Sequence, residues 1–313
     1  MTKIIWKILQ RLRRWNNLRK LKLSMPNQAR DIRPYNVAPR LSVIIQLFNK
    51  KQNIASIIAA LKHGNADEII VIDDGSRDGA IEILPGLLTG KNEFVVRCND
   101  LFEVRTYSRA IDFSRGEIVA LLQDDDLPPE SGSWMEEAIA LFGKYPKLAV
   151  LGGFLGLELS FGPPQEPHDR LMARQPAPSA KIAYTLRSLG PDKKSHQTFD
   201  FIEVINRAPM FVRRSALSVL GGIDQVFAPF QCDDVDLCLK AWLGGFQVGL
   251  YHAPFVHDVG MGGMRLFNAE RIPVQAERNW RIIAERYGAR IATGEIASLV
   301  AKARQDASIQ ASL

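Results

Sequence analysis

Residues 41–126 alternate between short apolar runs and longer stretches in which apolar residues recur every three or four positions. The short runs are typical of buried strands, and the longer stretches are typical of helices with one buried side. We expect strands at residues 41–48, 68–74, 93–97 and 117–122, and helices at residues 50–63, 80–88 and 103–114. Apolar strands that alternate with helices predict a mostly parallel sheet covered on both faces. The predicted fold class is therefore α/β.

The pattern becomes less regular after residue 126. We expect a helix at residues 130–144, an apolar strand at 148–155 and a terminal helix at 269–287. In the terminal helix, Trp280 and Ile283 should face the body of the protein. Residues 156–196 contain six prolines and little periodicity, which predicts a long surface excursion.

Residues 1–24 form a separate pattern. On a helix turning about 100° per residue, most apolar side chains fall on one half and most cations outside it. The apolar half consists of Ile4, Ile5, Ile8, Leu9, Leu12, Trp15 and Leu18. The cations interrupt the run of about 20 apolar residues that a membrane span needs, and they also exclude a secretory signal. We expect a basic amphipathic helix that lies on an anionic membrane surface, or one that packs on its own domain or on a partner.

Composition changes this picture in one respect. Residues 1–24 hold eight of the 40 Lys and Arg residues and no acid, so the rest of the chain carries 32 basic and 34 acidic side chains. The net charge of +6 therefore reports the N-terminal segment, and we expect no nucleic-acid partner.

Cys98, Cys232 and Cys238 have no paired spacing, which favours reduced thiols in a cytoplasmic protein.

The chain divides into four parts on these patterns. They are the amphipathic helix at 1–24, a proline-containing linker at 25–40, a folded domain at 41–290 and a helical tail at 291–313. Hydrophobic residues make up 46% of the 313 residues, which is enough for a substantial core.

The strongest chemical signal is the sequence Gln123-Asp124-Asp125-Asp126, which closes the apolar strand at 117–122. Ligands of open α/β sheets bind beyond the carboxyl ends of the strands, and Mg²⁺ and Mn²⁺ prefer carboxylate oxygens, often together with substrate phosphates. An acidic turn after a strand is the alternative. Because three adjacent carboxylates repel one another, a cation should offset them.

Several motifs in succession resemble the family 2 glycosyltransferases, which are inverting enzymes of the GT-A fold. They are LSVIIQLFN from residue 41, EIIVIDDGSRDG from 68, GEIVALLQDDD from 116, FVRRSALSVLGGID from 211 and CDDVDLCLKAW from 232. The resemblance covers residues 41–287 and depends on the order and spacing of the motifs. It implies a GT-A type central sheet with a Rossmann-like nucleotide-sugar-binding half at 41–126 and an acceptor-binding half at 127–290.

The resemblance implies a binding site for a UDP-, dTDP- or GDP-sugar. Asp73 and Asp74, at the end of the second strand, correspond to an aspartate that holds the base or ribose, although a capping turn is the alternative. Phe48 stands where the family usually has Tyr and either flanks the base or belongs to the core. Arg105 corresponds to a basic residue that reaches the diphosphate, with Arg109 as a competing candidate and a solvated helix charge as the alternative.

The acidic cluster departs from the family's usual Asp-x-Asp, because Gln123 replaces the first acid. In register, Asp125 is the first choice as ligand of Mg²⁺ or Mn²⁺. Asp124 contacts the ribose or the metal, and Asp126 reaches the metal through water or orients its neighbour. The resemblance also implies His257 as a metal ligand, with an ordinary hydrogen-bonding histidine as the alternative.

The second acidic position opens a predicted helix. Asp233 and Asp234 correspond to the family's Glu-Asp pair, in which the second acid deprotonates the acceptor hydroxyl and the first helps to hold the acceptor. The alternative is that the helix dipole favours carboxylates at this end. Asp236 is expected to be structural.

These observations predict a metal-dependent inverting glycosyltransferase that adds sugars to a glycan or lipid-linked acceptor in cell-surface polysaccharide or glycolipid assembly. The N-terminal helix would place it peripherally on the inner face of the plasma membrane. One alternative is a catalytically silent nucleotide-sugar-binding or membrane scaffold protein. A sugar nucleotidyltransferase is less favoured, because QLFNKKQN after the first strand lacks a glycine-rich phosphate loop.

Overall fold

The computed structural model describes residues 39–162, 182–190, 198–207, 209–257 and 271–312. Contacts divide the chain into two units, Met1–Ala38 and Pro39–Leu313. The predicted helix at 1–24, nearly all of the predicted linker and the glycine-rich loop after His257 lie outside the described residues. The fold described below is that of the unit from Pro39 onward.

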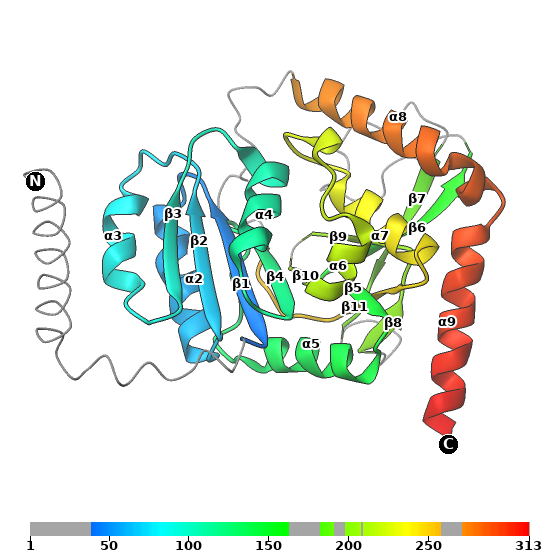
Figure 1. The fold of residues 1–313 in the computed structure, drawn as a ribbon, viewed down its shortest axis with the longest axis horizontal. Helices are drawn as coiled ribbons and strands as arrows, with labels where there is room; N and C mark the ends of the chain where they lie inside the picture. The colour runs from blue at the N-terminus through cyan, green and yellow to red at the C-terminus, as the bar shows by residue number, and fades with distance from the viewer. Residues whose placement is uncertain (1–38, 163–181, 191–197, 208, 258–270, 313) are drawn as a thin grey trace, which may run out of the picture. The chain divides into compact units, whose positions relative to one another are not determined.

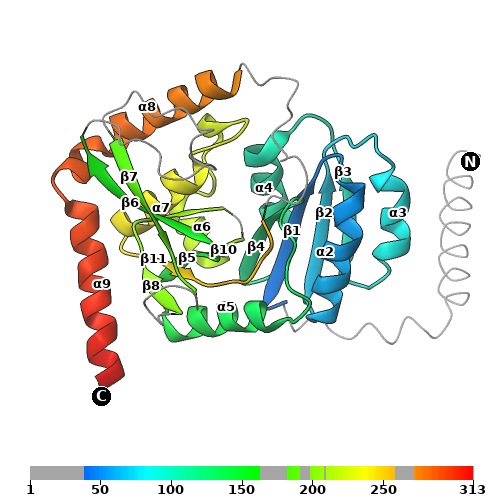
Figure 2. The same cartoon turned by 180° about the vertical axis from the view of Figure 1, so that it is seen from behind.

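The first part of this unit alternates strands with helices (Figure 1). The elements are β1 Leu41–Leu47, α2 Lys51–His63, β2 Glu68–Asp73, α3 Ala80–Leu87, β3 Glu93–Arg97, α4 Phe102–Phe113 and β4 Ile118–Gln123. Each boundary lies within one residue of the boundary expected from the sequence. The two opposite views show α4 on one face of the sheet and α2 on the other (Figures 1 and 2). Burial on both faces explains why β1, β2 and β4 are almost continuously apolar.

The second part mixes short strands with helices. Its strands are β5 Leu148–Gly152, β6 Leu155–Phe161, β7 Ile182–Ser188, β8 Phe199–Phe201, β9 Val204–Asn206, β10 Met210–Arg213 and β11 Gln247–Tyr251. Its helices are α5 Ser133–Lys144, α6 Arg214–Leu220, α7 Asp233–Leu243, α8 Arg271–Ala292 and α9 Glu295–Ser312, with a 3₁₀ turn, η3, at Gln225–Phe227.

The two parts share one sheet of eight strands in the order β3-β2-β1-β4-β10-β5-β11-β8. Six strands run in one direction, and β10 and β8 run in the opposite direction. A second sheet has the order β7-β6-β9. The predicted fold class, an α/β fold with a mostly parallel central sheet flanked by helices, is confirmed.

The reversed direction of β10 has a consequence for the site. Met210, its first residue, pairs with Leu121 near the carboxyl end of β4. The chain therefore enters β10 from the same edge at which β1, β2 and β4 end. Residues immediately before β10 are brought to that edge, together with the residues that follow β4.

The prediction of one strand at 148–155 followed by irregular chain is wrong. The strand ends at Gly152, and β6 and β7 form seven antiparallel residue pairs on either side of residues 163–181, which lie outside the described chain. A Cβ at Gly152 would lie 2.6 Å from Cβ of Ile205, so close packing against β9 accounts for the glycine where the strand stops. The sequence did not reveal β6 and β7, because each has only a short alternation of apolar and polar residues and prolines lie between them.

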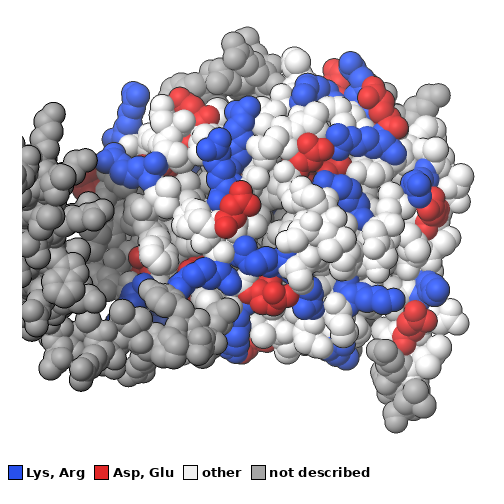
Figure 3. All heavy atoms as spheres, in the orientation of Figure 1, with Lys and Arg blue, Asp and Glu red and all other residues white. Residues whose placement is uncertain are grey.

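The C-terminal helices pack on the second part of the sheet. Trp280 and Ile283 of α8 are buried, as expected. Ile296 and Val300 of α9 are also buried, and Arg304 donates to the Asp200 carboxylate and to the carbonyl oxygen of Phe201 in β8. Figure 3 shows basic and acidic side chains interspersed on one face of the molecule.

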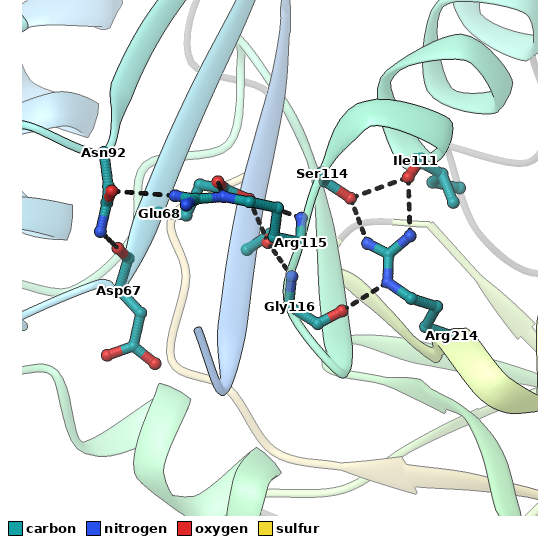
Figure 4. Close-up of polar contacts among 9 residues, drawn as sticks. Asp67, Glu68, Asn92, Ile111, Ser114, Arg115, Gly116 and Arg214 are labelled. Atoms are coloured by element: carbon teal, nitrogen blue, oxygen red, sulfur yellow. Dashed lines mark hydrogen bonds and ion pairs between the residues drawn. The ribbon is translucent and has the colours of Figure 1, made fainter. Parts of the chain in front are cut away.

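A buried polar cluster joins the strands at the amino-terminal edge of the sheet (Figure 4). Glu68 begins β2 and accepts hydrogen bonds from the Ser42 hydroxyl at 2.6 Å, from Arg115 Nε at 2.7 Å and from the Arg115 backbone N–H at 2.9 Å. Arg115 also donates to the Asn92 side chain. The Arg115 guanidinium therefore neutralises a carboxylate whose side chain is only 2% exposed.

Arg115→Met is expected to lower the free energy of unfolding by about 2 kcal/mol, because it leaves the buried Glu68 carboxylate without its cation. This is less than the cost of breaking a fully buried pair, since the Arg115 side chain is 36% exposed. Urea unfolding measures the change. The control Arg187→Met removes a surface pair with Glu158 and should cost about 0.5 kcal/mol. Equal losses in the two variants would contradict the assignment.

Candidate active site

The acidic turn after β4 lies at the carboxyl edge of the sheet. Asp124, Asp125 and Asp126 are all buried. Asp124 Oδ2 accepts a hydrogen bond from the Phe48 backbone N–H at 2.6 Å, and Asn53 Nδ2 donates to the Asp124 carbonyl oxygen at 2.9 Å. β1 and β4 are parallel and adjacent, which brings Phe48 and Asp124 together at the ends of these strands.

The charge state of Asp124 is set by its surroundings. Burial raises the pKa of its carboxyl to about 8, the Phe48 N–H opposes that rise, and the negative charge of Asp125 adds to it. Lys50 lowers the pKa again. In the absence of a further cation, the turn therefore favours a neutral Asp124.

Asp126 and His257 form a hydrogen-bonded pair. An antiparallel bridge between Leu127 and Val256 brings the segment after β11 against the acidic turn, and His257 Nδ1 lies 2.6 Å from Asp126 Oδ1. The imidazole ring also stacks on Phe154, with ring centroids 3.6 Å apart. His257 Nε2 is buried and has no hydrogen-bond partner among the residues that the structure describes. The Asp126 carboxylate therefore holds the Nδ1 side of the His257 ring.

The His257 ring satisfies one requirement for a divalent metal. With the Nδ1 proton held by Asp126, neutral imidazole would present its Nε2 lone pair as a ligand. Among the described residues, no three His, Cys, Asp or Glu side chains form a group arranged to hold a metal ion. A Mg²⁺ or Mn²⁺ ion bound here would therefore need further oxygen ligands besides these side chains, such as substrate phosphates.

The second acidic corner is the first turn of α7. Gln231 and Cys232 have positive φ angles of 72° and 64°, which are costly for residues other than glycine. These two residues end the loop that precedes α7. Asp233 is buried and Asp234 is half-buried. Asp236 faces α8, where it accepts hydrogen bonds from Arg286 and the Tyr287 hydroxyl, and is structural.

Burial raises the pKa of Asp234 to about 6, and the adjacent Asp233 adds to the rise. The Arg207 cation and the Val235 and Arg207 backbone N–H groups oppose it. The Arg207 N–H donates to Asp234 Oδ2 at 3.4 Å. A carboxylate with a pKa near 6 is ionised at neutral pH, yet it is a better proton acceptor than an ordinary aspartate.

A chain of contacts joins the two acidic corners. Gln123 Nε2 donates to Glu103 Oε1 at 2.6 Å, and the same oxygen lies 2.9 Å from Arg207 Nη1. The other terminal nitrogen of Arg207 binds Asp233 Oδ2. Since Gln123 precedes Asp124 and Asp233 precedes Asp234, the two predicted acidic corners face one region of the fold.

Glu103 and Arg207 were not predicted from the sequence. Arg207 lies in VINRAP, which carries no recognisable motif, and Glu103 looks like an ordinary charge in the first turn of a helix. The only available signal was Gln123, an amide where the resemblance leads one to expect an acid. An amide can donate to Glu103, whereas a carboxylate cannot.

The remaining predicted residues occupy different settings. Asp73 is buried, and its Oδ1 accepts a hydrogen bond from the Ser76 N–H. Asp74 is fully buried, and its two oxygens accept from the backbone N–H groups of Leu101 and Phe102, which fixes the loop before α4. Arg105 is exposed on the first turn of α4. The structure thus adds a structural task for Asp74 to the predicted nucleotide contact.

Within the described chain, no helix has the length and apolar character that crossing a membrane requires.

A model of the family described as Glycosyl transferase family 2 matches residues 42–217 of the chain. A curated relative, "Uncharacterized protein y4gI" of Sinorhizobium fredii, is 25% identical over 243 residues, which cover 71% of this chain. The chain spans a quarter of that relative's length.

Solved structures are also similar to this chain. GalNAc-T7, solved with UDP, GalNAc and Mn²⁺, is 14% identical with a TM-score of 0.49, and the match covers 69% of this chain and 43% of that one. S. aureus TarS residues 1–349, solved with UDP, is 14% identical with a TM-score of 0.49, and the match covers 79% of this chain and 72% of that one.

The unsubstituted protein should lose stability as the pH rises, and Asp124→Asn should prevent the part of that loss that Asp124 causes. In the unfolded chain an aspartate has a pKa of about 3.9. In the metal-free folded protein the pKa of Asp124 is raised to about 8, so its stabilising contribution is complete below about pH 4 and is lost by about pH 8. Asparagine stays neutral and can still accept the Phe48 N–H.

Urea unfolding in a metal chelator at about pH 5 and pH 8 measures this effect. The variant should gain stability relative to the unsubstituted protein between the two pH values. Asp112→Asn, at an exposed position of α4, is the control. A relative stability of Asp124→Asn that does not change with pH would contradict the assignment.

Proposed function

Because the chain belongs to glycosyl transferase family 2, we propose that it transfers a sugar from a nucleoside-diphosphate sugar to an acceptor hydroxyl, with inversion at the anomeric carbon. The observation that carries the proposal is the continuous contact from Gln123 through Glu103 and Arg207 to Asp233. It brings the carboxylate turn after β4 and the first turn of α7 to one region. A donor bound at the first corner can therefore meet an acceptor bound at the second.

Asp234 is the proposed general base. Its half-buried carboxylate accepts the proton of the acceptor hydroxyl as the oxygen attacks the anomeric carbon. Attack from the face opposite the diphosphate forms the new glycosidic bond while the bond to the leaving phosphate oxygen breaks. A single displacement of this kind inverts the configuration and needs no covalent intermediate. Asp233 is held by Arg207 next to the base and helps to position the acceptor.

The donor is proposed to lie along the edge formed by β1, β2 and β4. Phe48 and Asp73 stand at the ends of β1 and β2, where the base and ribose would bind. Asp124, whose carboxylate accepts the Phe48 N–H, is the proposed contact to the ribose. Arg105 is exposed on α4, and its guanidinium is the proposed contact to the diphosphate.

Asp125 and His257 are the proposed protein ligands of Mg²⁺ or Mn²⁺, with Asp126 orienting the imidazole ring. A divalent cation in this position supplies charge neutralisation for the departing nucleoside diphosphate. Two features support this assignment, the carboxylate turn and the buried Nε2 of His257, which has no partner within the described part of the chain.

We further propose that residues 1–24 hold the protein on the anionic inner surface of the plasma membrane. The basic and apolar halves of this segment support the proposal, since each cation near such a surface contributes about 1 kcal/mol. A glycan or lipid-linked acceptor in surface polysaccharide or glycolipid assembly suits that location.

Asp234→Asn is expected to lower turnover by about 10²- to 10⁴-fold, because asparagine cannot accept the acceptor proton. Binding of the nucleotide-sugar should be nearly unchanged, since the donor lies at the other corner. Transfer from a panel of UDP-, dTDP- and GDP-sugars, with proton NMR of the anomeric product, measures activity and stereochemistry. Retained configuration, or full turnover in Asp234→Asn, would contradict the mechanism. A protein that binds donors without any transfer would be a scaffold.

Asp125→Asn is expected to weaken Mn²⁺ binding by about tenfold or more, because it removes the proposed carboxylate ligand. Titration of Mn²⁺ followed by electron paramagnetic resonance, with and without nucleoside diphosphate, measures the affinity. Asp112→Asn is the control, because it removes an exposed carboxylate of α4. Equal Mn²⁺ affinity of the unsubstituted protein and Asp125→Asn would exclude Asp125 as a ligand.

A further inference from the structure

Arg207 is a buried cation that pairs with carboxylates of two helices, Glu103 of α4 and Asp233 of α7. Its side chain is 4% exposed, and the Asp233 side chain that it binds is 2% exposed. Its guanidinium also lies 4.6 Å from the centroid of the Tyr107 ring, whose hydroxyl donates to the Leu122 carbonyl oxygen of β4. Arg207 therefore contacts both α4 and α7 while it stands just before β10.

Gln123 completes the arrangement. Glu103 Oε1 accepts from Gln123 Nε2 and also pairs with Arg207 Nη1, so a single oxygen joins the end of β4 to the cation. A carboxylate at position 123 would face Glu103 at this distance and repel it. The amide at the position where the family usually has an acid is thus required by the neighbouring side chains of this chain.

We propose that Arg207 is a positioning residue for Asp234, and that the Gln123–Glu103 pair anchors Arg207 so that the base stays in register with the donor-binding edge. The proposal rests on the proposed function of Asp234. It assigns Arg207, Glu103 and Gln123 a shared task in holding the acceptor corner against the donor corner. None of the three needs to touch a substrate.

The position of Arg207 is fixed from two directions. Its backbone N–H donates to Asp234 Oδ2, and its guanidinium holds Asp233, the residue before the base. Arg207 pairs with two carboxylates, and a movement away from either one would leave that carboxylate without its cation. Movement of the β4 end would therefore be transmitted through Glu103 to the first turn of α7.

Arg207 and Glu103 have opposite effects on the pKa of Asp234. The charged and titratable groups near Asp234 are Asp233, Cys232, Asp236 and Cys238 of α7 and its cap, Arg207 before β10, and Glu103 of α4. Arg207 lowers the pKa of Asp234, whereas the carboxylates of Asp233 and Glu103 oppose its ionisation. Loss of the cation should raise the pKa of the base, and loss of the Glu103 charge should lower it.

The pH dependence of kcat/KM for sugar transfer tests the proposal. In the unsubstituted protein the acidic limb should lie near pH 6, where Asp234 ionises. Arg207→Gln should move that limb upward by about one pH unit or more, and Glu103→Gln should move it downward. Arg207→Lys keeps the charge and should restore the position of the limb more than it restores kcat, because lysine lacks the two-sided guanidinium.

Arg286→Gln is the matched control. Arg286 lies on α8 and binds Asp236, which is on α7 like Asp234 but on the side of α7 that faces α8. This variant should therefore lose stability without moving the acidic limb. If Arg207→Gln does not fold, Glu103→Gln and Arg207→Lys still test the proposal by the direction of their shifts. Limbs that stay together in all variants, or that move in one direction, would overturn it. Absence of transfer by the unsubstituted protein would instead refute the proposed function.

Discussion

The candidate site depends on one buried guanidinium. Arg207 lies between Glu103 on α4 and Asp233 on α7, and its buried cation offsets the repulsion between their carboxylates. The contact is made possible by the antiparallel strand β10. Because β10 starts where β4 ends, the residues before it reach the carboxyl edge of the parallel strands, and the cation arrives at the junction of the two halves of the sheet.

The same edge separates tasks among acids that look alike in sequence. Asp74 is committed to the backbone of the loop before α4, and Asp236 is committed to α8. Asp126 orients an imidazole ring. Asp234 accepts hydrogen bonds from the Arg207 and Val235 backbone N–H groups beside it. The proposed function gives the acceptor proton to Asp234 and the metal to Asp125. Packing therefore commits some of these carboxylates to supporting contacts.

Departure from the family motif at Gln123 has a local physical reason. The amide donates to Glu103, and Glu103 in turn pairs with Arg207. The acid that is missing at position 123 is thus accompanied by an acid on α4, Glu103, to which Gln123 donates. Membership of glycosyl transferase family 2 does not itself account for this exchange, which follows from the side chains around position 123.

Sequence alone determined the local elements of the first part and the chemistry at their ends. Hydrophobic periodicity is a property of neighbouring residues, so the boundaries of β1 to β4 and the acidic turn at 124–126 could be predicted closely. Periodicity could not reveal β6 and β7, whose pairing spans residues 163–181, nor the partner of Gln123, which lies 20 positions away. Tertiary structure alone decided which charges meet, because burial and opposite strand direction bring Glu103, Arg207 and Asp233 together from three separate elements.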